Sequence, residues 1–196
     1  MKDIWFADNR DLVKWSVLFH LAERYRIDSI LQIAYYTPSI FSKISIDSEE
    51  INLPPAIINH FRNIRTVEKI DCKFKITVFD RTFDDRKTYL DAASKFIRGQ
   101  TGIPKIVFLD PDTGLAPKKP LLTHVLDTEA NTFWNLLELS DLFVFYQHQT
   151  NRNGQPWIKQ KRKQLAVALG ISDEKIKVAQ GKKIARDVVF YYALKI

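Results

Sequence analysis

The sequence predicts an α/β protein built on a single doubly wound, mostly parallel sheet with helices on both faces and a C-terminal antiparallel hairpin. Short apolar runs alternate with longer helical stretches, which is typical of a parallel sheet covered by helices. The last two apolar runs, residues 175–179 and 185–195, are too close in sequence for a crossover helix, so they must pair as an antiparallel hairpin. The 196 residues, 45% of them hydrophobic, suffice for one compact domain, which we expect to span residues 1–196.

The first expected element is a helix at residues 12–25, LVKWSVLFHLAERY, with Asp8, Asn9 and Asp11 as candidate N-terminal caps. Its apolar residues cover nearly the whole circumference of the helix. This pattern predicts a helix that is buried on all sides.

Strands and helices then alternate along the chain, with prolines at the start of one helix and glycines after two others. We expect strands at 29–37, 73–80, 105–110 and 141–148, helices at 54–70, 86–99, 123–139 and 157–169, and hairpin strands at 175–179 and 185–195. Residues 42–55, SKISIDSEEINLPP, fit neither pattern, and we expect a surface loop there.

Charge and cysteine content narrow the functional classes. The formal net charge of +7 favours phosphate-rich partners, although many basic proteins bind no nucleic acid. Cys72 is the single cysteine, which excludes an intramolecular disulfide and a cysteine-based zinc site. We therefore expect a protein of the reducing cytoplasm. No apolar run approaches the ~20 residues that cross a bilayer, so we expect no membrane span.

Polar side chains follow the expected parallel strands, at the edge where ligands bind in doubly wound sheets. The buried run KIVFL ends in DPDTG, so Asp110 and Asp112 leave it beside a proline and a glycine turn. Such aspartates either form a site or only cap a turn, and the whole block with Asp80 nearby favours a site. His148 follows the next strand as a candidate acid or base, or as a hydrogen-bonded residue at the rim. We expect Asp110, Asp112 and His148 to be catalytic.

Several common catalytic motifs are absent from the sequence. It contains no HxH, HExxH or Cys/His cluster, so we expect no transition-metal site. It also lacks a GxSxG elbow, a P-loop and GxGxxG, which argues against serine hydrolases, NTPases and ordinary dinucleotide enzymes.

A basic and aromatic cluster follows the strand that carries His148. We expect its residues to contact nucleic acid through phosphate-binding charges and a stacking ring, although a solvated helix face would have a similar composition. The candidates are Arg152, Trp157, Lys161 and Arg162.

The order of these elements resembles that of the class I S-adenosylmethionine-dependent methyltransferases, a Rossmann-like topology. The opening ADNRDLVKW looks like that of the ribosomal-RNA adenine-N6 methyltransferases, and FLDPDTG stands where those enzymes carry a DPPY-type motif. The resemblance implies S-adenosylmethionine as cofactor and Asp110 as acceptor for the amino group of a target adenine. It implies the following cofactor-binding residues: Asp80 at the ribose hydroxyls, and Asn9 and Lys14 near the methionine carboxylate. We also expect Gln32, a polar residue that the first strand offers at the ligand edge, to bind the cofactor.

The sequence departs from that family at four places. The first strand ends in ILQIAYYTP without glycine, and Asp112 and Thr113 replace the second proline and the aromatic residue of DPPY. Trp15 stands in place of a histidine, and the chain between Asp80 and Lys105 is one strand short.

Two alternative functions therefore stay open. In the first, Asp80, Asp84, Asp110 and Asp112 bind Mg²⁺ in a nuclease or another phosphotransfer enzyme. In the second, the protein is a catalytically silent methyltransferase relative that binds nucleic acid or a partner subunit. The sequence leaves the oligomeric state open.

Overall fold

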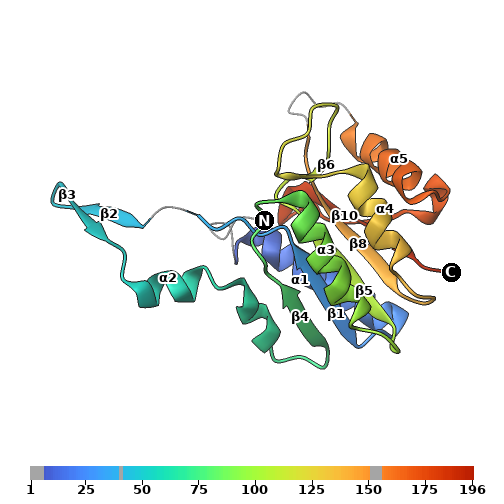
Figure 1. Cartoon of the computed structure of the whole chain (residues 1–196), viewed down its shortest axis with the longest axis horizontal. Coiled ribbons are helices and arrows are strands. Elements are labelled where there is room, and N and C mark those ends of the chain that lie inside the picture. The colour runs from blue at the N-terminus through green and yellow to red at the C-terminus, as the bar shows by residue number, and fades with distance from the viewer. Residues whose placement is uncertain (1–6, 40–41, 151–155) are drawn as a thin grey trace.

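One six-stranded sheet organises the protein, whose computed structural model describes residues 7–39, 42–150 and 156–196 (Figure 1). Across the sheet the strands lie in the order β4 (Lys75–Phe79), β1 (Ser29–Ala34), β5 (Lys105–Asp110), β8 (Leu142–His148), β10 (Ala185–Leu194) and β9 (Lys177–Gly181). The first four of these strands are parallel, and β10 runs antiparallel between β8 and β9. The predicted fold class, with its C-terminal antiparallel hairpin, is therefore confirmed.

The strand order creates a switch point between β1 and β5. From β1 the chain moves outward to β4, and from β4 it crosses back to β5 on the other side of β1. In doubly wound sheets, ligands bind beyond the carboxyl ends of the strands at such a point. A single helix lies between β4 and β5, which agrees with the expected shortage of one strand.

Helices cover both faces of this sheet. One face carries α1 (Asn9–Tyr25) and the 3₁₀ helix η2 (Ile64–Lys69). The opposite face carries α3 (Arg86–Arg98), α4 (Asp127–Asn135) and α5 (Trp157–Leu169), and a short 3₁₀ helix, η3 (Asp173–Lys175), follows α5 (Figure 1). Among the described residues, no helix has the length and apolar character needed to cross a membrane.

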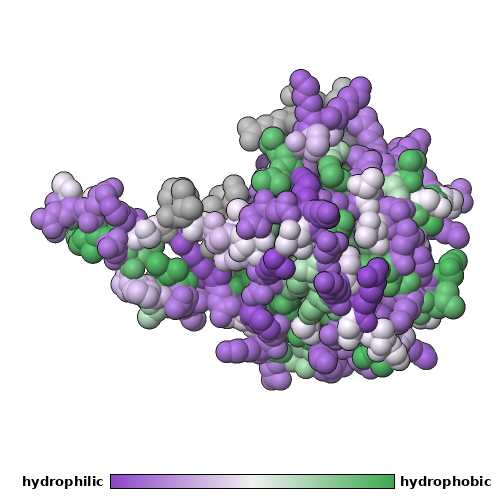
Figure 2. Space-filling model, in the orientation of Figure 1, coloured by the Kyte–Doolittle hydropathy of each residue, from purple (hydrophilic) through white to green (hydrophobic). Residues whose placement is uncertain are grey.

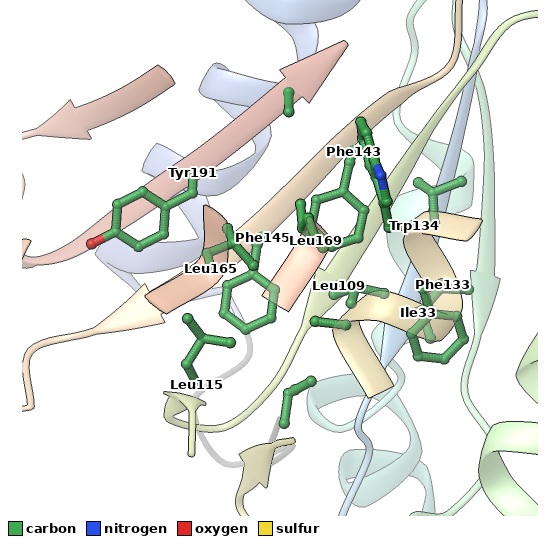
Figure 3. Packing of buried hydrophobic residues seen from close by; sticks show 14 of the residues in the cluster. Ile33, Leu109, Leu115, Phe133, Trp134, Phe143, Phe145, Leu165, Leu169 and Tyr191 are labelled. Atoms are coloured by element: carbon green, nitrogen blue, oxygen red, sulfur yellow. The ribbon is translucent and has the colours of Figure 1, made fainter. Parts of the chain in front are cut away.

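Two hydrophobic clusters hold these layers together, one on each face. Figure 3 shows the larger cluster, in which Phe143 and Phe145 of β8 point toward Leu165 and Leu169 of α5. The sheet strands at its centre are buried on both faces, as the uninterrupted apolar sequences of β5 and β8 require.

Helix α1 is amphipathic, so the prediction that it is buried on all sides is wrong. The side chain of Leu12 is 57% exposed, whereas Lys14 is only 4% exposed. Asp8 is the N-cap, and its carboxylate accepts hydrogen bonds from the backbone N–H groups of Arg10 and Asp11. The prediction was based on the number of apolar residues, some of which, such as Leu12, lie on the outer face of α1. The sequence alone did not show that Lys14 is on the inner face, where it pairs with buried carboxylates.

The segment expected to be a surface loop instead forms a hairpin. Strands β2 (Lys43–Ile46) and β3 (Glu49–Asn52) pair antiparallel around a two-residue turn in which both Asp47 and Ser48 have positive φ. This is the turn geometry whose twist matches a hairpin. The alternation of isoleucine with polar residues was the missed strand signal.

The helix expected at 54–70 is divided into α2 (Pro55–Phe61) and η2. Asn63 lies at the break, where its side chain accepts a hydrogen bond from the backbone N–H of Arg65 and caps η2. We call residues 42–61, which comprise the hairpin and α2, the arm. The arm projects away from the sheet (Figure 1).

The helix expected at 123–139 is also shorter, because α4 begins at Asp127. The residues before it contribute β7 (His124–Val125), which pairs with β6 (Gly114–Leu115) in a two-stranded sheet beyond β5. Glu129 accepts a hydrogen bond from the backbone N–H of Leu126 and so fixes the start of α4.

Candidate functional site

A cavity of about 280 Å³ opens at the carboxyl ends of β5 and β8, where the first turns of α1 approach the sheet. Its volume lies near the lower end of the range of about 300–1,000 Å³ that is usual for ligand clefts. The lining residues are mostly polar and come from α1, the segment after β5 and the end of β8: Asp8, Arg10, Asp11, Lys14, Asp110, Pro111, Asp112, Thr113, Tyr146 and His148.

Asp110 lies at the centre of the polar network. Its Oδ2 atom is 2.9 Å from Lys14 Nζ and 2.6 Å from Gln32 Nε2. Lys14 Nζ also lies 2.5 Å from Asp11 Oδ1. Within the described part of the chain, the hydrogen bonds that Asp110 accepts all go to Oδ2, which leaves Oδ1 to accept from a ligand.

The ion pairs of this network are buried, so its charges depend on one another. Burial acts most strongly on the pKa of Lys14 and would lower it, but the charges of Asp110 and Asp11 raise the pKa overall, and Lys14 remains a cation. Burial raises the pKa of Asp11, and Asp110 adds to this effect while Lys14 opposes it. Removing one partner from such a group leaves an unpaired buried charge, which is strongly destabilising.

A second network borders the cavity at β10. Arg10 Nη2 lies 2.6 Å from Asp187 Oδ2, and Arg10 Nη1 lies 2.9 Å from Asp8 Oδ2. His148 Nε2 lies 3.1 Å from the same oxygen of Asp187. Burial opposes ionisation of Asp187, but Arg10 and His148 lower its pKa overall. His148 is thus oriented by a carboxylate at the cavity wall, which is an arrangement suited to proton transfer.

Gln147 and Lys161 hold the DPDTG segment in place. The Gln147 amide accepts from the backbone N–H of Leu115 and donates to the carbonyls of Thr113 and His148. Lys161 Nζ donates to the carbonyl of Leu115 at 2.9 Å. Gly114 has φ +122°, and a Cβ there would come within 2.4 Å of Gln147 Nε2, so this position requires glycine.

The chain beyond β1 stays extended and packs closely. The backbone N–H of Tyr35 donates to the carbonyl of Asp110, and Tyr36 forms an isolated parallel bridge with Thr82. The Tyr35 side chain is 2% exposed and packs against Phe83 and Tyr89. The ring of Tyr35 therefore belongs to the hydrophobic core next to the end of β1.

The structure brings together five of the predicted catalytic and cofactor-binding residues. Lys14 and Gln32 bind Asp110 directly, and Asp112 and His148 line the same cavity.

Asn9 and Asp80 do not join this group. Asn9 is exposed on the first turn of α1 and is not among the lining residues. Asp80 follows β4 with a side chain that is 38% exposed, and its ion pair with Arg65 is long, at 3.9 Å.

The predicted nucleic-acid residues are largely engaged within the fold. Trp157 is part of the hydrophobic core and is 8% exposed. Lys161 is buried against β6, and Arg162 Nη2 lies 2.7 Å from Asp173 Oδ2. Burial lowers the pKa of Lys161. Arg152 lies outside the described residues. Trp157 and Lys161 are thus packed within the fold, and contact between this cluster and nucleic acid stays a prediction.

Sequence reasoning assigned no catalytic or binding role to Asp8, Arg10, Asp11, Tyr146 and Asp187, which line or border the cavity. Asp11 stands three residues before Lys14, a spacing that brings side chains together on a helix, and this signal was available. Tyr146 lies 5.6 Å, measured from its ring centroid, from Lys14 Nζ. Burial raises its pKa, so it presents a neutral hydroxyl. Asp187 had no local signal, because only the pairing of β10 with β8 brings it to His148.

The residues that the structure describes show no cluster of metal-ligating side chains. They contain no group of three or more histidine, cysteine, aspartate or glutamate side chains arranged to hold an ion. Asp110 faces an ammonium group, and Asp80 and Asp84 do not line the cavity. The Mg²⁺ alternative therefore lacks its expected ligand set.

Comparisons with known proteins concern the fold. No protein-family model and no curated protein matches the chain. A candidate methyltransferase from Thermobifida fusca aligns over 95% of this chain and 80% of its own, with a TM-score of 0.46 and 13% sequence identity. A DUF574 family protein from Streptomyces avermitilis aligns over 96% and 82%, with a TM-score of 0.45 and 11% identity.

A third solved structure, a SAM-dependent methyltransferase from Aquifex aeolicus, covers 96% of this chain and 97% of its own at a TM-score of 0.35 and 8% identity.

Proposed function

We propose that this protein is a divergent S-adenosylmethionine-dependent methyltransferase-like protein whose substrate presents an amino group of a nucleic-acid base. The observation that carries the proposal is the position of Asp110. It lies at the carboxyl end of β5, beside the switch point, with Oδ2 bound by Lys14 and Gln32 and no described donor on Oδ1.

The charge of the cavity supports an N–H donor as ligand. Four carboxylates line it, against two permanent cations, Arg10 and Lys14, which both already form ion pairs within the site. An amino group entering the cavity would donate a hydrogen bond to Asp110. His148, oriented by Asp187, would then accept or relay the proton that such a group loses.

The cofactor would lie at the ends of β1 and β4. The exposed carboxylate of Asp80, with its long ion pair to Arg65, fits the role of accepting hydrogen bonds from ribose hydroxyls. When bound, S-adenosylmethionine supplies an electrophilic methyl group. In this chain the segment after β1 carries Tyr35 and Tyr36 in place of a glycine-rich turn.

The packing of Tyr35 and Tyr36 favours a second candidate, a catalytically silent relative. Such a protein would keep the sheet and the Asp110 cavity for binding nucleic acid or a partner. The bridge between Tyr36 and Thr82 and the buried ring of Tyr35 occupy the region that a glycine-rich turn leaves accessible to a cofactor.

Calorimetry with S-adenosylmethionine separates the two candidates. On the first, the cofactor binds the wild-type protein and raises its melting temperature, since a ligand at about 100 times its dissociation constant adds about 2.7 kcal/mol of stability. Asp80→Ala should abolish both effects. Asp84→Ala is the matched control, because Asp84 is an exposed carboxylate four positions further along and should leave binding intact.

Absence of binding by folded wild-type protein at millimolar cofactor would reject the first candidate and leave the second. Binding that survives in Asp80→Ala would retain a cofactor site but refute the role given to this carboxylate.

A further inference from the structure

None of the residues of the arm is buried. Every residue of β2 and β3 is exposed, and α2 contributes no buried residue. An isolated two-stranded hairpin is at best marginally stable in water. A well-formed hairpin without a core therefore points to a surface that completes it from outside the chain.

The hairpin concentrates its apolar side chains on one face. Ile44 and Ile51 are directly opposite each other in the register, and Ile46 lies two residues along β2 on the same face, where Glu49 is opposite it next to the turn. Their exposed fractions are 43%, 43% and 48%. The other face carries polar residues, including Ser45 opposite Glu50. Figure 2 shows hydrophobic surface on the arm, beneath the hairpin and along α2.

The arm is acidic, although the protein is basic. It contains one basic residue, Lys43, and three acidic residues, Asp47, Glu49 and Glu50, which gives a formal charge of −2. Because the whole chain has a net charge of +7, the remainder of the chain carries +9. A partner surface that is apolar at its centre and basic at its rim would complement this hairpin.

The protein itself has an apolar groove between α1 and η2. A groove of about 500 Å³ there is lined by apolar side chains that include Leu12, Trp15, Phe19, Val67 and Ile70. Asp8 and Asp11 close one end of the groove, and both are already paired with cations.

Two further features, one at the rim of the groove and one at its wall, suit a docked hairpin. Lys69 of η2 is exposed beside it and supplies positive charge, whereas Arg65 is already paired with Glu68 and Asp80. The indole Nε1 of Trp15 is buried and has no acceptor among the residues that the structure describes. A docked strand would provide polar atoms at this wall.

We propose that the arm of one copy docks, apolar face inward, in the α1–η2 groove of a second copy, and that the second arm returns the contact. The exchange is isologous, so it closes as a two-fold dimer and makes each arm–groove contact twice. It buries the isoleucine face and sets the acidic turn beside Lys69. This assembly is independent of whether the Asp110 cavity binds a cofactor.

Sedimentation velocity over a concentration series tests the exchange. The wild-type protein should sediment as a dimer, at twice the 22.9 kDa chain mass, and dissociate on dilution. Ile44→Lys should raise the dissociation constant about a hundredfold, since each of the two contacts loses about tenfold. Ser45→Lys adds the same charge one residue away on the opposite face, so its dissociation constant should stay within about threefold of wild type.

A groove variant identifies the receiving surface. Leu12→Lys should be monomeric alone, yet a mixture of Leu12→Lys with Ile44→Lys should form a heterodimer through the one intact arm and the one intact groove. A wild-type protein that is monomeric throughout would overturn the proposal. So would a Leu12→Lys variant that stays dimeric, which would indicate contact between two arms.

Discussion

Lys14 Nζ of α1 lies 2.9 Å from Asp110 Oδ2 at the end of β5, across a separation of 96 residues. This ion pair joins the first helix to the carboxyl edge of the sheet, and Asp11 and Gln32 complete it. The lysine thus has two functions. It compensates buried negative charge, and it fixes which oxygen of Asp110 can face a ligand.

Replacing Lys14 should show how strongly the folded state depends on this ion pair. Lys14→Met leaves Asp11 and Asp110 buried without a cation, and we expect a loss of about 3–5 kcal/mol in the free energy of unfolding, measured with urea at neutral pH. Lys159→Met is the control, because Lys159 is exposed on α5 and its loss should change stability by no more than about 0.5 kcal/mol. Equal effects of the two changes would refute the role of Lys14.

The raised pKa of Asp11 predicts a pH dependence of stability. Because its pKa is higher in the folded protein than the value of about 3.9 in the unfolded chain, the folded state binds more protons between these two pKa values. The contribution of Asp11 to stability is then fully present below about pH 4 and falls as pH rises through the folded pKa. Asp11→Asn should therefore lose less stability, relative to wild type, at pH 7 than at pH 4.5. Urea titrations of both proteins at the two pH values would show the opposite trend if ionisation of Asp11 stabilised the folded protein.

Gly114 offers a steric prediction about the DPDTG segment. Gly114→Ala combines a backbone strain of about 1–3 kcal/mol with a collision between Cβ and the Gln147 amide. Gly102→Ala is the matched control, because Gly102 also has positive φ, +91°, but no atom lies within 4 Å of its added Cβ. Thermal unfolding should show a larger loss for Gly114→Ala. Equal losses would mean that Gln147 moves aside without cost.

Much of the sheet was predictable because each of its central strands has a recognisable local sequence pattern. The apolar runs that form β5 and β8 are uninterrupted, and their polar residues follow at the strand ends, so the sequence also indicated Asp110 and His148. The antiparallel position of β10 followed from the short connection to β9. These features depend on local pattern and connection length alone.

The remaining features depend on contacts between distant segments. The pairing of Lys14 with Asp110 and of His148 with Asp187 arises only when the strands are assembled in order. A basic run likewise cannot reveal that Lys161 turns inward to a carbonyl of β6. The hairpin of the arm was missed for a different reason, because its alternation of isoleucine with polar residues is short and all residues of its two strands are exposed.

Nucleic-acid binding at α5 stays a prediction, and the structure shifts its test to other residues. Lys159 and Lys163 are exposed on this helix, whereas Lys161 supports β6 and Trp157 is in the core. If a single strand passes along α5 by its phosphates, replacing Lys159 and Lys163 with glutamine should weaken binding for all sequences and lower the slope of log affinity against log salt by about one to two units.

Trp157→Ala separates stacking from packing. The loss of a buried tryptophan should cost about 3–5 kcal/mol of stability, while the affinity of the remaining folded protein stays unchanged. A ring that stacked on a base would instead cost about 1–3 kcal/mol of binding to single strands. Filter-binding titrations over a salt series, run below the unfolding transition of each variant, distinguish the two results. Wild-type protein without measurable affinity at low salt would exclude nucleic acid as the partner of this helix, whatever the cofactor experiments give.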